Sequence, residues 1–299
     1  MTRRATGGVL SRPASRADLP AVLALYWRYD EVIRGARDTD EDDVSSDWDV
    51  TGFDFSTSTL LLEQDGLAVG YAVLGDDGDA DTVSDPELRE NGTDDLLLAW
   101  LEAKNRPVEH HLPTEDAAGA AIFGRRGWQP TRRFWRMRIE LDRELPTGCW
   151  SAGVAVRSHD RPGDDVAVHA LVETCFAEIG GQHPRTLEQW STALLTSPRF
   201  DPALCLVARC GGDVVGAALS QDLGDYGFVR QLAVTPSMRG KSLGIALLHE
   251  CFRRHAARGL PATVLGVDAA NPTGALALYE KAGMRIVEQF TRWEWHPAP

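Results

Sequence analysis

The sequence predicts an α/β protein built from two similar units in tandem, and three observations support this prediction. The same order of short apolar strands, turns and amphipathic helices occurs twice along the 299 residues. Glycines separate paired apolar runs in both copies, which indicates β-hairpins. Helical patterns punctuate these strands, as is typical of mixed α and β structure. We place the units at residues 10–145 and 153–297, with a linker around Pro146 and Gly148.

The repeat can be followed element by element through both units. Helices are predicted over residues 17–29 and 164–177, and hairpins over residues 60–72 and 204–218. Each unit then continues through a further helix to a Phe/Trp-rich terminal strand. The numbering offset between the copies is 145 at Arg12 and Arg157. It reaches 156 at Phe123 and Tyr279, so the first unit has lost about ten residues in its second half.

The bulk composition excludes several classes of protein. A net charge of −13 argues against nucleic acid as a partner. No apolar run approaches the ~20 residues that a membrane-spanning helix needs, and the N-terminus lacks the apolar core of a secretory signal. The five cysteines are odd in number and show no C-x-x-C spacing, which favours reduced thiols over disulfides or zinc. We therefore expect a cytoplasmic protein without a metal cofactor or a membrane partner.

A strand–turn–helix pattern in the second unit is the most informative stretch of the chain. Residues 231–234 form a short apolar strand, Pro236 ends it, and an amphipathic helix is predicted to open within residues 239–244. The first turn of a helix leaves backbone N–H groups without partners and carries a positive potential. Two glycines let an anion approach this backbone, and Arg239 and Lys241 add full charges. The pattern predicts a cradle for a diphosphate, although an ordinary structural corner is the alternative.

This stretch resembles the acyl-CoA-binding segment of the GCN5-related N-acetyltransferase (GNAT) superfamily. The family motif, Arg/Gln-x-x-Gly-x-Gly/Ala after Val-x-Pro, stands here as residues 239–244 after Val234 and Pro236, with Ser242 in place of the first glycine. A second segment, residues 271–284, resembles the family's Asn-x-x-Ala-x-x-Leu-Tyr-Glu-x-x-Gly-Phe pattern. The resemblance implies the fold class α/β (α+β), with two tandem GNAT-like domains that are each a mixed, mostly antiparallel sheet flanked by helices.

The resemblance implies acetyl-CoA as the co-substrate and assigns roles to residues of the second unit. The strand backbone would pair with pantetheine and stabilise the oxyanion at Leu232, Ala233 and Val234. The helix start would bind the diphosphate through Arg239, Gly240, Lys241, Ser242, Leu243, Gly244 and Ile245. Asn271 would turn its amide toward pantetheine or phosphate, and Tyr279 would protonate the departing sulfur as the catalytic acid. A tyrosine packed at the edge of the sheet is the alternative for Tyr279.

No general base is evident on the central strand. The family often has a glutamate there, but residues 226–231 contain no carboxylate in this chain. A chain of water molecules is one alternative. Asp222, Asp225 and Asp268 lie nearby in the sequence and are candidates for the base, and His183 and Asp268 are candidates for the acceptor side of the site. Each of these four side chains is more simply explained as a solvated or capping residue.

The corresponding loop of the first unit is altered. Alignment on a shared proline places Arg89 over the phosphate loop, but Asp94 replaces its closing glycine. A carboxylate at a helix start repels a diphosphate, at about 4 kcal/mol for one pair of unit charges ~4 Å apart in a surface-like dielectric. Phe123 takes the place of Tyr279 and cannot donate a proton. We predict that the first unit does not bind acyl-CoA and serves as a scaffold.

Together these patterns predict an N-acetyltransferase with a degenerate N-terminal unit and an active C-terminal unit. It would move acetyl from acetyl-CoA directly to a primary amine of a small molecule, such as an antibiotic or amino sugar, within a ternary complex. The arrangement is similar to that of mycothiol synthase, although the missing strand carboxylate weakens a match in activity. The alternatives are a protein or peptide amine as acceptor, and a non-catalytic module that binds CoA or a metabolite. We expect a monomer or a homodimer.

Overall fold

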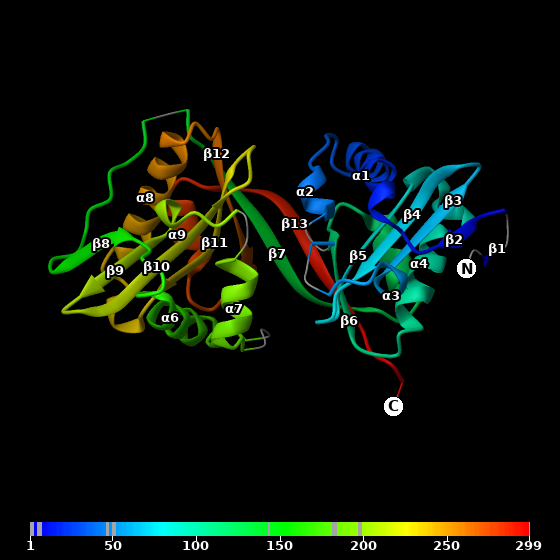
Figure 1. The fold of residues 1–299 in the computed structure, drawn as a ribbon. Coiled ribbons are helices and arrows are strands. Elements are labelled where there is room, and N and C mark those ends of the chain that lie inside the picture. The colour runs from blue at the N-terminus through cyan, green and yellow to red at the C-terminus, as the bar shows by residue number, and fades with distance from the viewer. Residues whose placement is uncertain are drawn as a thin grey trace. The chain divides into compact units, whose positions relative to one another are not determined.

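A computed structural model describes residues 3–4, 8–45, 48–49, 52–142, 144–180, 184–196 and 199–298. The chain divides into two compact units (Figure 1), of which the first comprises Met1–Arg133 with Gln289–Pro299 and the second comprises Phe134–Glu288. His183, a predicted acceptor residue, lies outside the described residues. No helix in these ranges has both the length and the apolar composition that a bilayer crossing requires.

The first unit follows the predicted order of elements. Its strands are β1 (Arg3–Arg4), β2 (Leu10–Arg12), β3 (Thr59–Gln64), β4 (Leu67–Leu74), β5 (Asp79–Ser84) and β6 (Val108–Pro113). Its helices are α1 (Leu19–Ile33), α2 (Glu41–Ser45), α3 (Phe55–Ser58), α4 (Thr93–Glu102) and α5 (Ala117–Arg125). Short 3-10 turns, η1 (Arg16–Asp18) and η2 (Pro86–Asn91), precede α1 and α4.

The second unit repeats this order. Its strands are β8 (Val154–Ser158), β9 (Leu206–Cys210), β10 (Asp213–Asp222), β11 (Gly227–Val234) and β12 (Ala262–Asp268). Its helices are α6 (Asp165–Ala177), α7 (Leu187–Leu194), α8 (Leu243–Ala257) and α9 (Ala275–Lys281), with 3-10 turns η3 (Pro202–Leu204) and η4 (Pro236–Met238). Two long strands, β7 (Gln129–Glu140) and β13 (Arg285–Trp295), each begin in one unit and end in the other.

Each unit has a mixed, mostly antiparallel sheet, as predicted. In the first unit the order is β1-β2-β3-β4-β5-β6, followed by residues 290–295 of β13. In the second it is β8-β9-β10-β11-β12, followed by residues 134–140 of β7. The pairs β5–β6 and β11–β12 are parallel, and the other pairs within these two orders are antiparallel. The parallel pair therefore occupies the same place in both copies of the repeat.

The aromatic strands β7 and β13 differ from the prediction. Residues 134–140 pair with β12 of the second unit, and residues 290–295 pair with β6 of the first. The compact units therefore do not coincide with the ranges 10–145 and 153–297, because the last strand of each range contributes to the other sheet. Both strands mix arginine with Phe and Trp, so the sequence pattern does not distinguish which sheet each of them completes.

The sheet of the second unit is covered by helices on both faces (Figure 1). One core forms beneath α8 and α9, where Leu247 and Phe252 are fully buried against the sheet. The other forms beneath α6 and α7, with Val168 and Trp190 buried against strand residues. Alternation along β11 sends Ala233 into the second core and leaves its neighbours on the α8 face. The candidate active site lies at the point where β11 separates from β12.

Candidate active site

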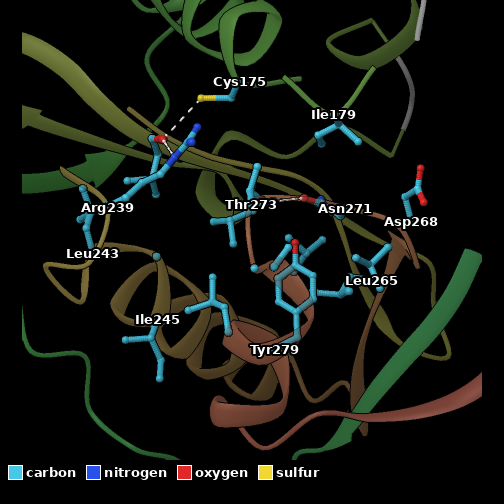
Figure 2. A pocket seen from close by; sticks show the side chains of 18 of the residues that line it. Cys175, Ile179, Arg239, Leu243, Ile245, Leu265, Asp268, Asn271, Thr273 and Tyr279 are labelled. Atoms are coloured by element: carbon cyan, nitrogen blue, oxygen red, sulfur yellow. Dashed lines mark hydrogen bonds between the residues drawn. The ribbon is translucent and has the colours of Figure 1, made fainter. Parts of the chain in front are cut away.

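A cavity of about 530 Å³ opens in the second unit at the point where three structures meet (Figure 2). These are the end of β11, the N-terminus of α8 and the segment that leads from β12 into α9. Every residue that lines the cavity belongs to the second unit. The cavity therefore joins the two sequence segments that carry the GNAT-like motifs.

The cavity exists because β11 and β12 separate. They pair in parallel from Gly227 with Thr263 to Val229 with Leu265, and β11 then continues to Val234. Opposite this point, the register with β10 shifts so that Arg230 has no partner residue. A bulge of this kind turns and twists the strand. Beyond Val229, one edge of β11 therefore carries backbone groups that face the cavity instead of a neighbouring strand.

The backbone groups on this open edge belong to alternate residues. Thr235 N donates a hydrogen bond to Val215 O at 3.0 Å on the β10 side. Antiparallel strands direct the backbone groups of every second residue to the same neighbour, so Ala233 faces β10, and Leu232 and Val234 face the open edge. Of the three predicted backbone partners of pantetheine, two are therefore placed for that role. Ala233 is turned away, which is a consequence of the two-residue period of a strand.

Helix α8 begins within the predicted range, residues 239–244. Residues 236–238 form the turn η4, and the helix starts at Leu243 with Ser242 as its N-cap. Ala246 N donates to Ser242 O at 3.1 Å, so the backbone N–H groups of residues 242–245 precede the first intrahelical bond. The cavity is lined by Gly240 and by residues 242–245. This helix end therefore carries the positive polarisation and the free N–H groups on which the prediction of an anion site is based.

Two positions of the loop have a backbone conformation that favours glycine. Ser242 has φ 63° and Gly240 has φ 72°, both in the left-handed region. In the first turn of α8, a Cβ on Gly244 would lie 3.1 Å from Leu278 Cδ2 of α9, so a larger residue there would make that side chain shift. Lys241 does not line the cavity, and its Nζ lies 4.0 Å from Met238 Sδ. Lys241 can therefore attract the diphosphate through its positive charge, but it does not contact the cavity.

Arg239 lines the cavity but already has protein partners. Its Nη1 lies 2.6 Å from Glu178 Oε2, next to the end of α6, and its Nε donates to Val234 O at 3.2 Å. The Cys175 thiol lies 3.5 Å from the same carbonyl (Figure 2). Hydrogen bonding to Glu178 raises the pKa of Arg239, so the guanidinium keeps its charge. The sequence signalled Arg239 but not Glu178, which is distant from the motif.

The segment before α9 does not use Asn271 as the cap of the helix. The N-cap position of α9 is Gly274, with φ 76°. Asn271 Oδ1 instead accepts hydrogen bonds from Thr273 N at 2.9 Å and from Thr273 Oγ1 at 2.6 Å. Asn271 and Thr273 both line the cavity. The amide oxygen of Asn271 therefore shapes the loop, and its NH₂ group remains the one that a ligand can use.

Tyr279 projects from α9 with its hydroxyl directed into the cavity (Figure 2). The residue is 8% exposed, and burial raises the pKa of its phenol to about 12. The phenol therefore holds its proton throughout the neutral range. A group that must donate a proton to a sulfur leaving group needs this state.

The predicted acceptor residues are only partly brought together. Asp268, at the end of β12, lines the cavity, and its Oδ1 accepts from Ala270 N at 2.8 Å. Asp222 and Asp225 are not in the cavity lining, and Asp222 Oδ1 accepts from Gly224 N in a turn. Sequence reasoning missed further lining residues, of which Arg230 and Phe134 are two. Arg230 was visible as a charge within an apolar strand, whereas Phe134 comes from β7 and gave no signal.

The first unit fills the equivalent position with its own charges. Arg89 donates to both oxygens of Asp116, at 2.5 and 2.7 Å, and Tyr29 OH donates to the same carboxylate at 2.9 Å. Burial opposes ionisation of Asp116, but the hydrogen bonds from Arg89 outweigh it and lower its pKa. Asp94 accepts from Ser84 Oγ at 2.6 Å and lies 3.4 Å from Arg89. An internal ion cluster thus stands where a diphosphate would bind.

Comparison with known proteins agrees with this geometry. Residues 166–284 match the family described as Acetyltransferase (GNAT). The mycothiol acetyltransferase of Thermobispora bispora is 33% identical over 244 residues, which cover 78% of this chain and 80% of that protein. The mycothiol acetyltransferase of Thermomonospora curvata is 32% identical over 243 residues, 79% of each chain.

The chain belongs to the GNAT family.

Solved GNAT structures extend the similarity to nearly the whole chain. A GCN5-related N-acetyltransferase from Sphaerobacter thermophilus superposes with a TM-score of 0.87 at 26% identity, covering 99% of this chain and 98% of that one. A tandem GNAT protein from the clavulanic acid biosynthesis pathway has the same fold, with a TM-score of 0.72 at 16% identity and coverage of 97% and 99%. The predicted tandem GNAT fold and the assignment as an acetyl-CoA-dependent N-acetyltransferase are thereby confirmed.

Proposed function

We propose that the second unit of this GNAT protein transfers acetyl from acetyl-CoA to the primary amine of a small molecule within a ternary complex. The observation that supports the proposal is the convergence, in one cavity, of the N-terminus of α8, the open edge of β11 and the Tyr279 hydroxyl. These features suit three parts of one co-substrate: its diphosphate, its pantetheine arm and its thioester sulfur.

Each protein group has a defined task in this proposal. The N–H groups of residues 242–245 and the guanidinium of Arg239 bind the diphosphate. The open-edge backbone of Leu232 and Val234 pairs with the pantetheine amides, and a backbone N–H on this edge stabilises the oxyanion. As the amine nitrogen bonds to the thioester carbon and the C–S bond breaks, Tyr279 gives its proton to the sulfur.

The amine must lose a proton by another route. Strand β11 carries no carboxylate, and Asp268 at the cavity wall is held by Ala270 N. We propose that the neutral fraction of the amine reacts and that its proton passes to water. The rate should then rise with pH until the amine of the acceptor is fully deprotonated.

A second candidate is an acceptor related to mycothiol, which the names of the relatives from Thermobispora bispora and Thermomonospora curvata favour. The absence of a carboxylate on β11 argues against the same proton-removal route as in family members with a strand glutamate. Acetylation of a protein or peptide amine and sensing of CoA without turnover are two further functions, which a thiol-release assay separates from the first.

Release of free thiol from acetyl-CoA tests the proposal. The whole protein is mixed with acetyl-CoA and a panel of amines: small polyfunctional amines, amino sugars, the acceptor of mycothiol acetyltransferases, and a lysine peptide. Amine-dependent release with at least one small molecule, and none with the peptide, is expected. Tight CoA binding without amine-dependent release would favour the sensor instead, and release with the peptide alone would favour a protein acceptor.

A further inference from the structure

Arg230 is a cation at the centre of the cavity wall. It is the bulged residue of β11, between Val229, which still pairs with β12, and the open edge that continues to Val234. The lining also includes the apolar side chains of Phe134 and Leu265. Arg230 is exposed, so solvent and ligands reach its side chain in the cavity.

This cation has no counter-charge in the protein. Within the described residues, no carboxylate forms an ion pair or a hydrogen bond with its guanidinium, in contrast to Arg239, which is paired with Glu178. Burial and the nearby positive charge of Arg185 both lower the pKa of Arg230. An accessible guanidinium in a cavity, with a like charge near it and no counter-charge from the protein, is a site for an anionic group of a ligand.

The diphosphate of the co-substrate is poorly placed to be that anion. Its proposed site is the N-terminus of α8, beside Arg239 and the end of β11. Arg230 lies four residues earlier on the strand than Val234, which is about 13 Å at the rise of a β-strand. The cation therefore stands toward the opposite end of the open edge, on the side where β11 and β12 part.

We infer that Arg230 binds an anionic oxyacid group of the acceptor, so that the preferred acceptors are amines that also carry a carboxylate or a phosphate. This inference rests on the proposed function and narrows its substrate class. A guanidinium suits either group, because it donates two parallel hydrogen bonds to a pair of oxygens. The charge of Arg230 would thus orient the acceptor so that the amine of the acceptor points to the thioester.

Matched pairs of amines test the inference in the full-length protein. Glycine is compared with glycinamide, and O-phosphoethanolamine with ethanolamine, by initial rates of thiol release with saturating acetyl-CoA. Rates are expressed per concentration of neutral amine, because this is the form proposed to react. The wild type should prefer the anionic member of at least one pair by tenfold or more in kcat/KM. The first pair reports a carboxylate and the second a phosphate, so the two sources of the anion are distinguished.

Variants then assign the preference to the residue. Arg230→Gln should remove the preference by raising KM for the anionic amines tenfold or more, with little change for their neutral partners. Arg230→Lys should retain part of it, because one charge remains without the paired donors. Arg253→Gln, on the exposed part of α8 outside the cavity lining, is the matched control and should behave as the wild type.

Calorimetry of the same amines into the CoA-saturated protein gives a second readout that does not need turnover. Absence of any Arg230-dependent preference for the anionic amines, in rates and in binding alike, overturns the inference. Equal losses in kcat for anionic and neutral amines also overturn it and point to a role at the acetyl group. Failure of the proposed function would give a different result. Either CoA would not bind, or no amine would cause thiol release although the protein still bound the anionic amines in preference.

Discussion

Arg239 and Glu178 form an ion pair at the phosphate end of the cavity, with Nη1 2.6 Å from Oε2. Both side chains are about one-third exposed, at 33% and 36%. Hydrogen bonding to Arg239 lowers the pKa of Glu178, so the carboxylate is ionised at neutral pH. The residue that the motif assigns to the diphosphate is thus already occupied by an anion of the protein.

The first prediction concerns Glu178→Gln. A diphosphate must displace the carboxylate from Arg239, so removal of its charge should tighten CoA binding by about threefold. Calorimetric titration of CoA measures the change. Arg239→Gln is the opposite control and should weaken binding. Weaker or unchanged CoA binding by Glu178→Gln would mean that Glu178 orients Arg239 productively and does not compete with the ligand.

The second prediction concerns Ser242→Gly. Ser242 holds φ 63° at the N-cap of α8, and no side-chain capping bond offsets this conformation. A left-handed conformation costs a residue with a Cβ about 1–2 kcal/mol, which glycine avoids. Ser242→Gly should therefore raise the free energy of unfolding by about 1 kcal/mol in denaturant titration. Ser242→Ala keeps the Cβ and is the control. A loss of stability in Ser242→Gly would show that the hydroxyl stabilises the loop.

The motifs could be located from the sequence because they are local. The departure of Ser242 from the expected glycine, for example, coincides with its left-handed backbone. The repeat likewise predicted both sheets and their hairpins. The features that the local pattern did not show depend on distant or alternating contacts. Arg239 meets Glu178 from another helix, and Ala233 is turned away by the period of the strand.

The terminal strands of the two units depend even more strongly on contacts between distant residues, which the sequence pattern does not show. Phe134 lines the cavity from a strand that the repeat assigned to the first unit. Both strands have a similar mixture of arginine and aromatic residues, so the local pattern does not distinguish which sheet each strand completes. The choice is made by the packing of residues such as Met137 and Trp293 in their cores, which no single segment of sequence encodes.

The third prediction concerns the ion cluster of the first unit. The side chain of Asp116 is fully buried and that of Arg89 is 9% exposed, so Asp116→Asn leaves a buried cation poorly compensated. The free energy of unfolding should fall by about 3 kcal/mol. Asp95→Asn, whose ion pairs are more exposed, should cost much less. CoA affinity should not change, and one CoA should bind per chain.

The same cluster gives the stability a defined pH dependence. Because the pKa of Asp116 is lowered in the folded state, its contribution is present above the pKa of an unfolded aspartate, about 4, and is lost as the pH falls through the lowered value. Denaturant titrations between pH 6 and pH 3, at about unit steps, should show this loss in the wild type and a shallower one in Asp116→Asn. A second CoA per chain in either protein would contradict the structural role of the cluster.

The fourth prediction concerns Tyr279→Phe. If the phenol protonates the sulfur, kcat should fall by at least about tenfold, while the dissociation constant of CoA stays within about twofold, because the ring and its packing are kept. With its pKa raised to about 12, Tyr279 stays protonated through pH 10, so a decline of kcat between pH 7 and pH 10 does not arise from this residue. Stopped assays of thiol release across this range test both statements.

Tyr226→Phe is the control variant. It also removes one hydroxyl from the second unit but lies outside the cavity lining, so it should keep the wild-type rate. Unchanged turnover in Tyr279→Phe at neutral pH would assign the proton to water and leave Tyr279 as a wall of the cavity.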